Sequence, residues 1–181
     1  MNKYWKHLKT VCRHKYYVFK ECAACGIGWQ GFIHDFSKFS PVEFLSSAKY
    51  FQGNRSPIEA EKEDIGYSAA WLHHKGHNKH HWEYWTDFDA STGEVLAAEI
   101  PIRYVIEMIC DWVGAGKAYN KDKWTQNGPL IHYTKMRPGR HFHPNTDRIL
   151  IESVTMISDK GLDAFHQYAR NMLKNYKRGL L

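Results

Sequence analysis

The sequence contains no apolar run that approaches the roughly 18 residues needed to span a bilayer. Residues 1–7 carry the positive charge of a signal peptide, but no apolar segment follows them. We therefore expect a soluble protein that is located in the cytoplasm and has no membrane as a partner.

Cysteine is scarce, with four residues in 181. In a reducing cytosol these side chains are expected to remain thiols. Cys22 and Cys25 have the spacing of a zinc or redox pair, but no second pair and no thioredoxin-like strand accompany them. We expect the cysteines to be small buried residues of helices.

The sequence also lacks β-alternation of useful length and internal repeats. Its 181 residues suffice for one domain with a real core and are too few for two comfortable ones. Along most of the chain, apolar residues recur at three- and four-residue steps, which is the helical period. The pattern predicts an all-α, single-domain protein over residues 1–181, with helices near residues 4–25, 41–51, 57 to the mid-70s, 102–119, 146–158 and 162–176.

Two of these helices have clear start signals. Ser40-Pro41 and Ser56-Pro57 each place serine at the N-cap and proline at the first helical position, and a glutamate follows two residues after each proline. This arrangement is typical of a capping box. Residues 120–145 are polar and contain Gly-Pro and Pro-Gly pairs, so we expect a loop-rich stretch with short helical pieces there.

Histidine, in contrast, is abundant, with 12 residues in the chain. Neutral imidazoles and carboxylates are the usual protein ligands for Zn, Fe, Mn and related divalent ions. The histidines in question form an ordered set with two aspartates: His14, His34, Asp35, His73, His74, His80, His81 and Asp111. The order predicts a metal site rather than scattered histidines.

The order of His14, the doublet His34-Asp35 and the distant Asp111 resembles that of the HD superfamily of metal-dependent phosphohydrolases. Apolar residues before the doublet and Lys38 after it strengthen the resemblance, which covers about the first two thirds of the chain. It implies a helical bundle of the HD type in which these four residues hold a divalent ion. The whole chain also looks like a small family of bacterial and phage proteins to which no activity is attached.

The extra histidines are similar to those of HD subfamilies that hold two metals, namely cyclic-dinucleotide phosphodiesterases and mixed-valent diiron oxygenases. The match has departures: His80-His81-Trp82-Glu83 only approximates the His-His-Glu of the phosphodiesterase branch, and its Gly-Tyr-Pro signature is absent. The sequence does not decide which member of His73-His74 and of His80-His81 faces the site. It also leaves open whether the cluster binds a second metal or a substrate phosphate.

Charge gives a hint about the substrate. Lysine and arginine number 25 against 19 acidic residues, a formal charge of +6, which favours anionic partners. The basic segment at residues 135–141 could line a site for phosphate, and several tryptophans between residues 71 and 124 could include one that stacks on a base. We expect the other histidines, His132, His141, His143 and His166, to lie at the surface.

The sequence thus predicts a phosphohydrolase that acts on a phosphate ester or phosphodiester of a nucleotide-like small molecule. The expected ligands of one or two ions (Mn, Fe, Zn or Co) are His14, His34, Asp35, His74, His80, His81 and Asp111. Lys38 and Asp35 are the expected catalytic residues, with Lys38 stabilising negative charge that develops on the phosphoryl group.

Two alternatives remain open. The first is an HD-type diiron oxygenase that uses His74 with His80 or His81. The second is a non-enzymatic nucleotide or nucleic-acid binding protein with a structural metal, although a small phosphorylated substrate is the favoured partner. The sequence makes no prediction of the oligomeric state.

Overall fold

The first helix, α1 (Lys3–Ala24), follows the predicted apolar stripe. A computed structural model describes residues 2–178 of the chain. The Asn2 side chain accepts a hydrogen bond from the Tyr4 amide at the start of α1, and Gly26, at φ 86°, follows its end. The buried side of α1 carries Val11, Val18 and Cys22, which recur at the helical period.

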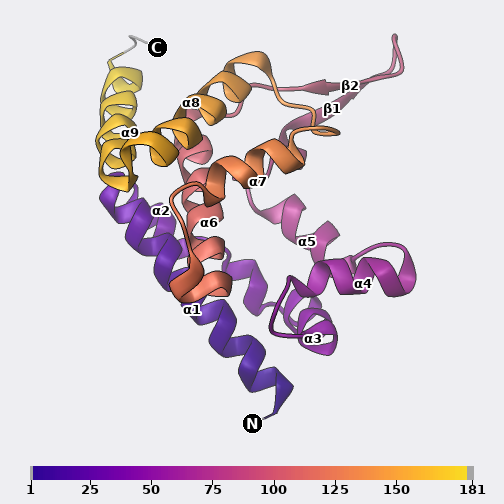
Figure 1. Cartoon of the computed structure of the whole chain (residues 1–181). Helices are drawn as coiled ribbons and strands as arrows, with labels where there is room; N and C mark the ends of the chain where they lie inside the picture. Colours follow the sequence, from indigo (N-terminus) through magenta and orange to yellow (C-terminus); the bar gives the residue numbers. More distant parts are fainter. Residues whose placement is uncertain (1, 179–181) are drawn as a thin grey trace.

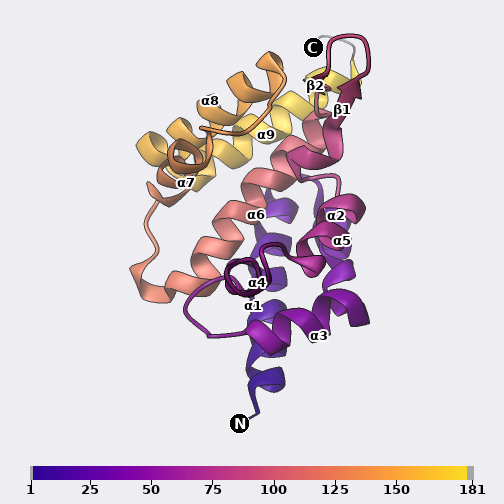
Figure 2. The same cartoon turned by 90° about the vertical axis from the view of Figure 1, so that its right-hand side faces the viewer.

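The core lies where α1 packs along α6 (Ile102–Asn120). Gly114 permits the close approach of the two helices, because a Cβ at this position would lie 2.4 Å from Val18 Cγ2. On the other side of α6 lie α7 (Gly128–Met136), α8 (Pro144–Lys160) and α9 (Leu162–Lys177), as Figures 1 and 2 show. Helix α6 is therefore the central element, with buried residues on most of its surface.

A second group of short elements packs beside α1 and α6. It consists of α2 (Gly28–Ile33), the 3-10 turn η1 (Phe36–Phe39), α3 (Pro41–Tyr50), α4 (Pro57–Ile65), α5 (Ala69–His77) and the 3-10 turn η2 (Trp82–Trp85). Ser40 and Ser56 cap α3 and α4 as predicted, accepting hydrogen bonds from the amides of Glu43 and Ile58. The second cap therefore bonds the residue before the expected glutamate.

The helix predicted from residue 57 to the mid-70s is in fact two helices. Gly66 adopts φ 82° and ends α4, and its amide bonds the Lys62 carbonyl. After this left-handed turn the Ser68 side chain caps α5 by accepting from the Trp71 amide at 3.0 Å. The sequence prediction was wrong here because the apolar pattern continues across a glycine that reverses the backbone.

A small hairpin joins η2 to α6 and was not predicted. Its strands, β1 (Thr86–Asp89) and β2 (Glu94–Ala97), are antiparallel, with Thr86 paired to Ala97 and Asp89 paired to Glu94. With four residues in each strand, the alternation of apolar and polar residues is too short to be recognised in the sequence. Within residues 120–145 lie the 3-10 turn η3 (Lys121–Lys123) and α7, joined by irregular segments.

The fold is thus all-α apart from this hairpin, and it forms a single domain. Cys22, Cys25 and Cys110 are buried between α1 and α6 as expected, whereas Cys12 is exposed, and all four are free thiols. Burial raises the pKa of the Cys110 thiol, which suits a packing role. In residues 2–178 no helix combines the length and apolar character that a membrane crossing requires.

Candidate metal centre

The His34-Asp35 doublet lies in the irregular turn between α2 and η1. His34 has φ −47° and ψ 131°, whereas Asp35 adopts φ 55° and ψ 28°, the left-handed conformation that aspartate tolerates better than most residues. The Lys15 ammonium of α1 donates to the His34 carbonyl and so ties the turn to α1. Because the backbone reverses at Asp35, two adjacent side chains reach the same buried space, where they are 2% and 1% exposed.

A first ligand group combines this doublet with one residue from each of the two long helices. His14 of α1 and Asp111 of α6 meet at 3.2 Å between Nε2 and Oδ1, and His14 Nε2 lies 3.3 Å from Asp35 Oδ2. His34 Nε2 lies 3.1 Å from Asp35 Oδ2 and 3.5 Å from Asp111 Oδ1. The four residues predicted from their order along the chain therefore converge in space.

A second ligand group forms on the other side of Asp35. His74 Nε2 lies 3.3 Å, and His80 Nε2 3.4 Å, from Asp35 Oδ1. His81 completes the group, with its ring centroid 4.1 Å from that of His80 and 4.7 Å from that of His74. In each group one candidate ligand atom per residue lies within 4.8 Å of the others, so each could hold an ion. Asp35 belongs to both groups and faces each with a different oxygen.

The structure shows which histidines of the two doublets, His73-His74 and His80-His81, reach the second ligand group. His74 is buried, whereas the His73 side chain is 27% exposed and bonds Glu43 instead. His80 and His81 both reach the second group, because α5 ends at His77 and the following residues are not helical. Residues 78–81 therefore do not continue α5, and this leaves both His80 and His81 free to face the second group.

The sequence analysis did not identify two glutamates that contact the Nδ1 atoms of the ligand histidines. Glu107 Oε1 lies 2.9 Å from His34 Nδ1 and 3.3 Å from His80 Nδ1, and Glu43 Oε2 lies 2.8 Å from His74 Nδ1. Since each Nδ1 faces a carboxylate, each Nε2 is directed toward Asp35. Glu107 could have been found as the residue one helical turn before Asp111. Glu43 is also the glutamate of the predicted capping box at Ser40, and that pattern gives no sign of its contact with His74.

The ionisation of the cluster follows from burial and charge together. Burial opposes protonation of His34, but the nearby carboxylates of Asp35, Asp111 and Glu107 raise the pKa of His34 well above its usual range. Burial would raise the pKa of Asp35 and Asp111, yet the surrounding cations and imidazoles hold both pKa values well below the ordinary value. The carboxylates are therefore ionised, as metal binding requires.

His81 differs from His34. Burial and the nearby imidazoles of His80 and His74 lower its pKa well below the usual value, so its ring is neutral at physiological pH. Burial also lowers the pKa of His74. Neutral imidazoles are the form of histidine that binds metals. The second group is thus rich in nitrogen ligands, whereas the first has two carboxylates.

The donor set fits a divalent cation. Among residues 2–178, four converging atoms are buried without a hydrogen-bond partner: His34 Nε2, Asp35 Oδ1, His80 Nε2 and His81 Nε2. Leaving such atoms unsatisfied is costly in a protein interior. A metal ion would satisfy them, since imidazole nitrogen with carboxylate oxygen is a usual ligand set for Zn, Fe and Mn.

Lys38 lies at the edge of the cluster. Its ammonium lies 2.5 Å from Asp35 Oδ2, and burial lowers its pKa less than the charges of Asp35 and Asp111 raise it, so it is cationic. Lys38, His14, His74 and Asp111 all border a cavity of about 710 Å³. The cluster is therefore open to a small molecule on one side.

The rest of the cavity lining combines cations with aromatic rings. Lys123, Lys135 and Arg140 line it; Arg140 bonds Glu83 at 3.3 Å, whereas the two lysines form no ion pair within residues 2–178. The aromatic lining residues are Trp71, Trp82, Trp112, Tyr119, Trp124 and His132. The predicted basic segment thus contributes two of its cations to the cavity, while its Arg137 pairs with Asp147 instead.

The prediction of a surface position was wrong for two histidines, His132 and His166. His132 lines the cavity, with its ring centroid 5.1 Å from that of Trp112. His166 lies 2.8 Å from the buried Glu21 carboxylate, and its side chain is 12% exposed. The sequence offered no signal for either, because both contacts join segments far apart in the chain.

Comparison with known proteins places the chain in a family but assigns it no activity. No curated protein and no solved structure matches it. One family model, described as a family of unknown function (DUF5662), matches residues 3–156. This match covers most of the chain, including both ligand groups, and the protein therefore belongs to that family.

Proposed function

We propose that the protein is a metal-dependent phosphohydrolase that acts on a phosphate ester or phosphodiester of a nucleotide-like small molecule. The observation that carries the proposal is the pair of ligand groups that share Asp35 at one side of a cavity lined by cations. The spatial arrangement of His14, His34-Asp35 and Asp111 is consistent with the HD-type order found in the sequence.

The ligand groups suit an ion that acts as a Lewis acid. A divalent ion bound here would polarise a phosphoryl oxygen and lower the pKa of a water molecule enough to make it a nucleophile at neutral pH. Asp35 would link the two groups, since its oxygens face different histidines. Glu107 and Glu43 would hold the imidazoles in a fixed tautomer and orientation.

Lys38 would bind the phosphoryl group beside the ligands. Its ammonium carries a full charge in a site of low exposure, where a fixed cation stabilises developing negative charge more than in water. It needs to turn only from Asp35 Oδ2 toward the cavity that it already borders. In this proposal Lys38 contacts the substrate rather than the ions.

The remainder of the cavity supports a substrate larger than a simple phosphate. Its volume of about 710 Å³ lies within the range of sites for drug-sized ligands. Tryptophan rings would cover a flat group such as a base, and Lys123 and Lys135 would attract further anionic groups. The lining thus favours an organic phosphate with an aromatic portion.

The second ligand group supports an alternative, an HD-type diiron oxygenase. His74, His80 and His81 with one carboxylate form a nitrogen-rich set, which suits iron. Metal identity separates the two candidates. Two irons per chain with a charge-transfer band would favour oxygen chemistry, whereas Mn, Zn or Co with phosphate release would favour hydrolysis.

The first experiment measures metal content and hydrolysis together. Untagged protein is analysed by elemental mass spectrometry, and phosphate release is assayed with nucleotides and cyclic dinucleotides after loading with Mn, Fe, Co or Zn. We expect one or two ions per chain, loss of all binding in Asp35→Ala, and loss at the first group alone in Asp111→Asn. The control is Asp147→Asn, because Asp147 pairs with Arg137 away from the cluster.

The outcomes separate the candidates. Full metal content in Asp35→Ala would contradict the shared role of Asp35. Metal binding without product from any substrate or ion would reject the phosphohydrolase. If that result came with nucleotide or nucleic-acid binding that weakens steeply with salt, a binding protein with a structural metal would replace it.

A further inference from the structure

Six large apolar side chains are exposed on the outer side of α1, α2 and η1. Their exposed fractions range from 40% for Phe39 to 73% for Trp29. We call this set the aromatic face: Phe19, Trp29, Phe32, Ile33, Phe36 and Phe39. Single exposed apolar residues are ordinary in proteins, but a contiguous group marks an interaction site.

The aromatic face is contiguous. The ring centroids of Trp29 and Phe32 are 5.5 Å apart, those of Phe32 and Phe36 are 5.8 Å apart, and those of Phe36 and Phe39 are 6.3 Å apart. Phe19 lies where α1 packs against α2, because a Cβ on Gly31 of α2 would lie 3.3 Å from Phe19 Cα. The row of rings therefore runs from α2 to the end of η1, and Phe19 lies on the neighbouring part of α1.

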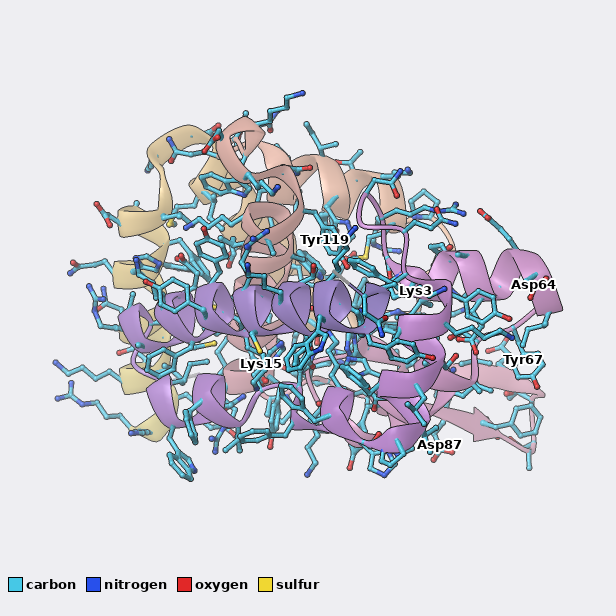
Figure 3. The ribbon with its side chains drawn as sticks, turned by 90° about the horizontal axis from the view of Figure 1, so that it is seen from below. Lys3, Lys15, Asp64, Tyr67, Asp87 and Tyr119 are labelled. Atoms are coloured by element: carbon cyan, nitrogen blue, oxygen red, sulfur yellow. The ribbon has the colours of Figure 1, made fainter. Side chains whose placement is uncertain are left out.

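The aromatic face and the cavity lie on different flanks of α1. The Lys15 ammonium lies over the Phe36 ring, 4.3 Å from its centroid, whereas Tyr119 lines the cavity. In the view from below, Lys15 and Tyr119 appear on opposite sides of the α1 ribbon (Figure 3). A partner on the aromatic face would leave the cavity accessible.

The surroundings of the aromatic face are cationic. Residues 2–42 contain seven lysines and arginines but only two acidic residues, Glu21 and Asp35, and both acids are buried. Lys9 and Lys20 of α1 are exposed, Arg103 bonds the Gln30 side chain of α2, and Arg170 bonds the Ala24 carbonyl at the end of α1. In the part of the chain that the structure describes, none of these four cations forms an ion pair with a carboxylate.

We propose that the aromatic face is a docking surface for an anionic lipid bilayer. Exposed Trp, Phe and Ile side chains would enter the headgroup and upper acyl region, as the apolar faces of peripheral helices do. The surrounding lysines and arginines would be attracted to anionic headgroups at the same time. Because no exposed carboxylate lies in residues 2–42, nothing there opposes this attraction.

Two other occupants fit the face less well. A second copy in two-fold contact would bring the two sets of unpaired cations together, and like charges would oppose association. Single-stranded nucleic acid stacks its bases on open ring faces. Here Phe32 and Phe36 meet edge to face at 84°, and Lys15 already lies over Phe36. Ile33 offers no ring at all.

This proposal differs from the expectation of no membrane partner, which rested on the absence of a spanning segment. A peripheral surface needs none, because residues from three elements supply its apolar area. The proposal does not depend on the hydrolase function. It can be tested with full-length protein and lipid alone.

The test is vesicle co-sedimentation at two salt concentrations, with phosphatidylcholine vesicles that contain or lack phosphatidylglycerol. We expect binding to the anionic vesicles only, and weaker binding at high salt. In the double variant Trp29→Ser, Phe32→Ser we expect affinity to fall at least about tenfold. In Lys9→Gln, Lys20→Gln we expect a loss of about 30-fold, from the attraction of two cations near the surface.

The matched control is Phe88→Ser, Leu96→Ser, which removes two exposed apolar side chains from the hairpin. It should bind like the parent, and circular dichroism with metal content shows that every variant folds. No binding to anionic vesicles, or equal loss in the control, would overturn the proposal. So would self-association or single-stranded DNA binding that disappears in Trp29→Ser, Phe32→Ser while vesicle binding is absent.

Discussion

At the scale of single residues, Asp35 decides the character of the site. Its left-handed backbone turns the side chain back beside His34, and its two oxygens face different sets of imidazoles. The strain of such a conformation is modest for aspartate and larger for most other residues. One carboxylate therefore joins two ligand groups that would otherwise be separate.

Glu107 is predicted to act as a positioning residue. In Glu107→Gln the side chain loses its negative charge, and an amide NH2 replaces the oxygen that accepts from the Gln30 amide, so the side chain no longer holds the imidazoles of His34 and His80 in a fixed orientation. We expect metal affinity to fall by about 10- to 100-fold while the number of bound ions at saturation stays the same. Titration against a chelator of known affinity measures the change.

The control for this prediction is Glu152→Gln, which removes an exposed carboxylate that bonds Arg148 and Tyr168 on the opposite part of the fold. Its metal affinity should equal that of the parent. An unchanged affinity in Glu107→Gln would show that the histidines are held by packing alone.

At the scale of elements, the contact between α1 and α6 carries both the core and the first ligand group. His14 lies one turn before Val18 on α1, and Asp111 lies one turn before Gly114 on α6. The packing that brings Val18 against Gly114 therefore also brings His14 to Asp111. The distance between the two helices sets the geometry of the ligands.

Gly114→Ala tests this dependence. The added Cβ would lie 2.4 Å from Val18 Cγ2 and 3.0 Å from the Val18 amide nitrogen, so the helices must move apart. We expect the free energy of unfolding to fall by about 1–3 kcal/mol. Urea unfolding followed by circular dichroism measures it, and metal content of the folded variant reports the ligand geometry.

Gly76→Ala is the matched control, because Gly76 is also helical and a Cβ there meets nothing within 4 Å. Alanine is the better helix former, so this variant should be more stable by up to about 1 kcal/mol. Equal stability of the two variants would contradict the close approach of α1 and α6.

At the scale of the whole molecule, a buried ion-pair network joins three helices. Glu21 of α1 bonds Lys117 of α6 at 2.6 Å and His166 of α9 at 2.8 Å, and it is 5% exposed. Burial would raise the pKa of Glu21, but the hydrogen bonds from His166 and Lys117 outweigh it and lower that pKa. The C-terminal helix is thus fixed to the helix that carries His14.

The lowered pKa of Glu21 predicts a pH dependence of stability. A carboxylate with a lower pKa in the folded state stabilises the fold fully above its unfolded pKa, and the contribution disappears as the pH falls through the folded value. We expect Glu21→Gln to lower the free energy of unfolding by about 1–3 kcal/mol at neutral pH. The difference from the parent should shrink in acid, as urea unfolding across pH would show.

Glu94→Gln, which changes an exposed residue of β2, is the control and should leave stability unchanged at each pH. A loss in Glu21→Gln that stays constant down to strongly acidic pH would mean that packing of the side chain matters rather than its charge.

The helices and the candidates for the first ligand group could be recognised from the amino-acid sequence. Helix formation is local, because hydrogen bonds and the apolar period span only a few residues, so α1, α3, α6, α8 and α9 could be predicted. Four ligand candidates were recognised because their order along the chain is characteristic. The break at Gly66 and the hairpin escaped prediction, since a glycine in a helical pattern and two four-residue strands carry weak signals.

Which histidines belong to the same ligand group depends on how the elements pack. His74 rather than His73 faces Asp35 because of how α5 lies against η1, and both His80 and His81 reach it because the chain leaves the helix after His77. Glu43 and Glu107 join the site through contacts that span 31 and 73 residues of sequence. Such contacts depend on how elements pack, and no local pattern in the sequence encodes that packing.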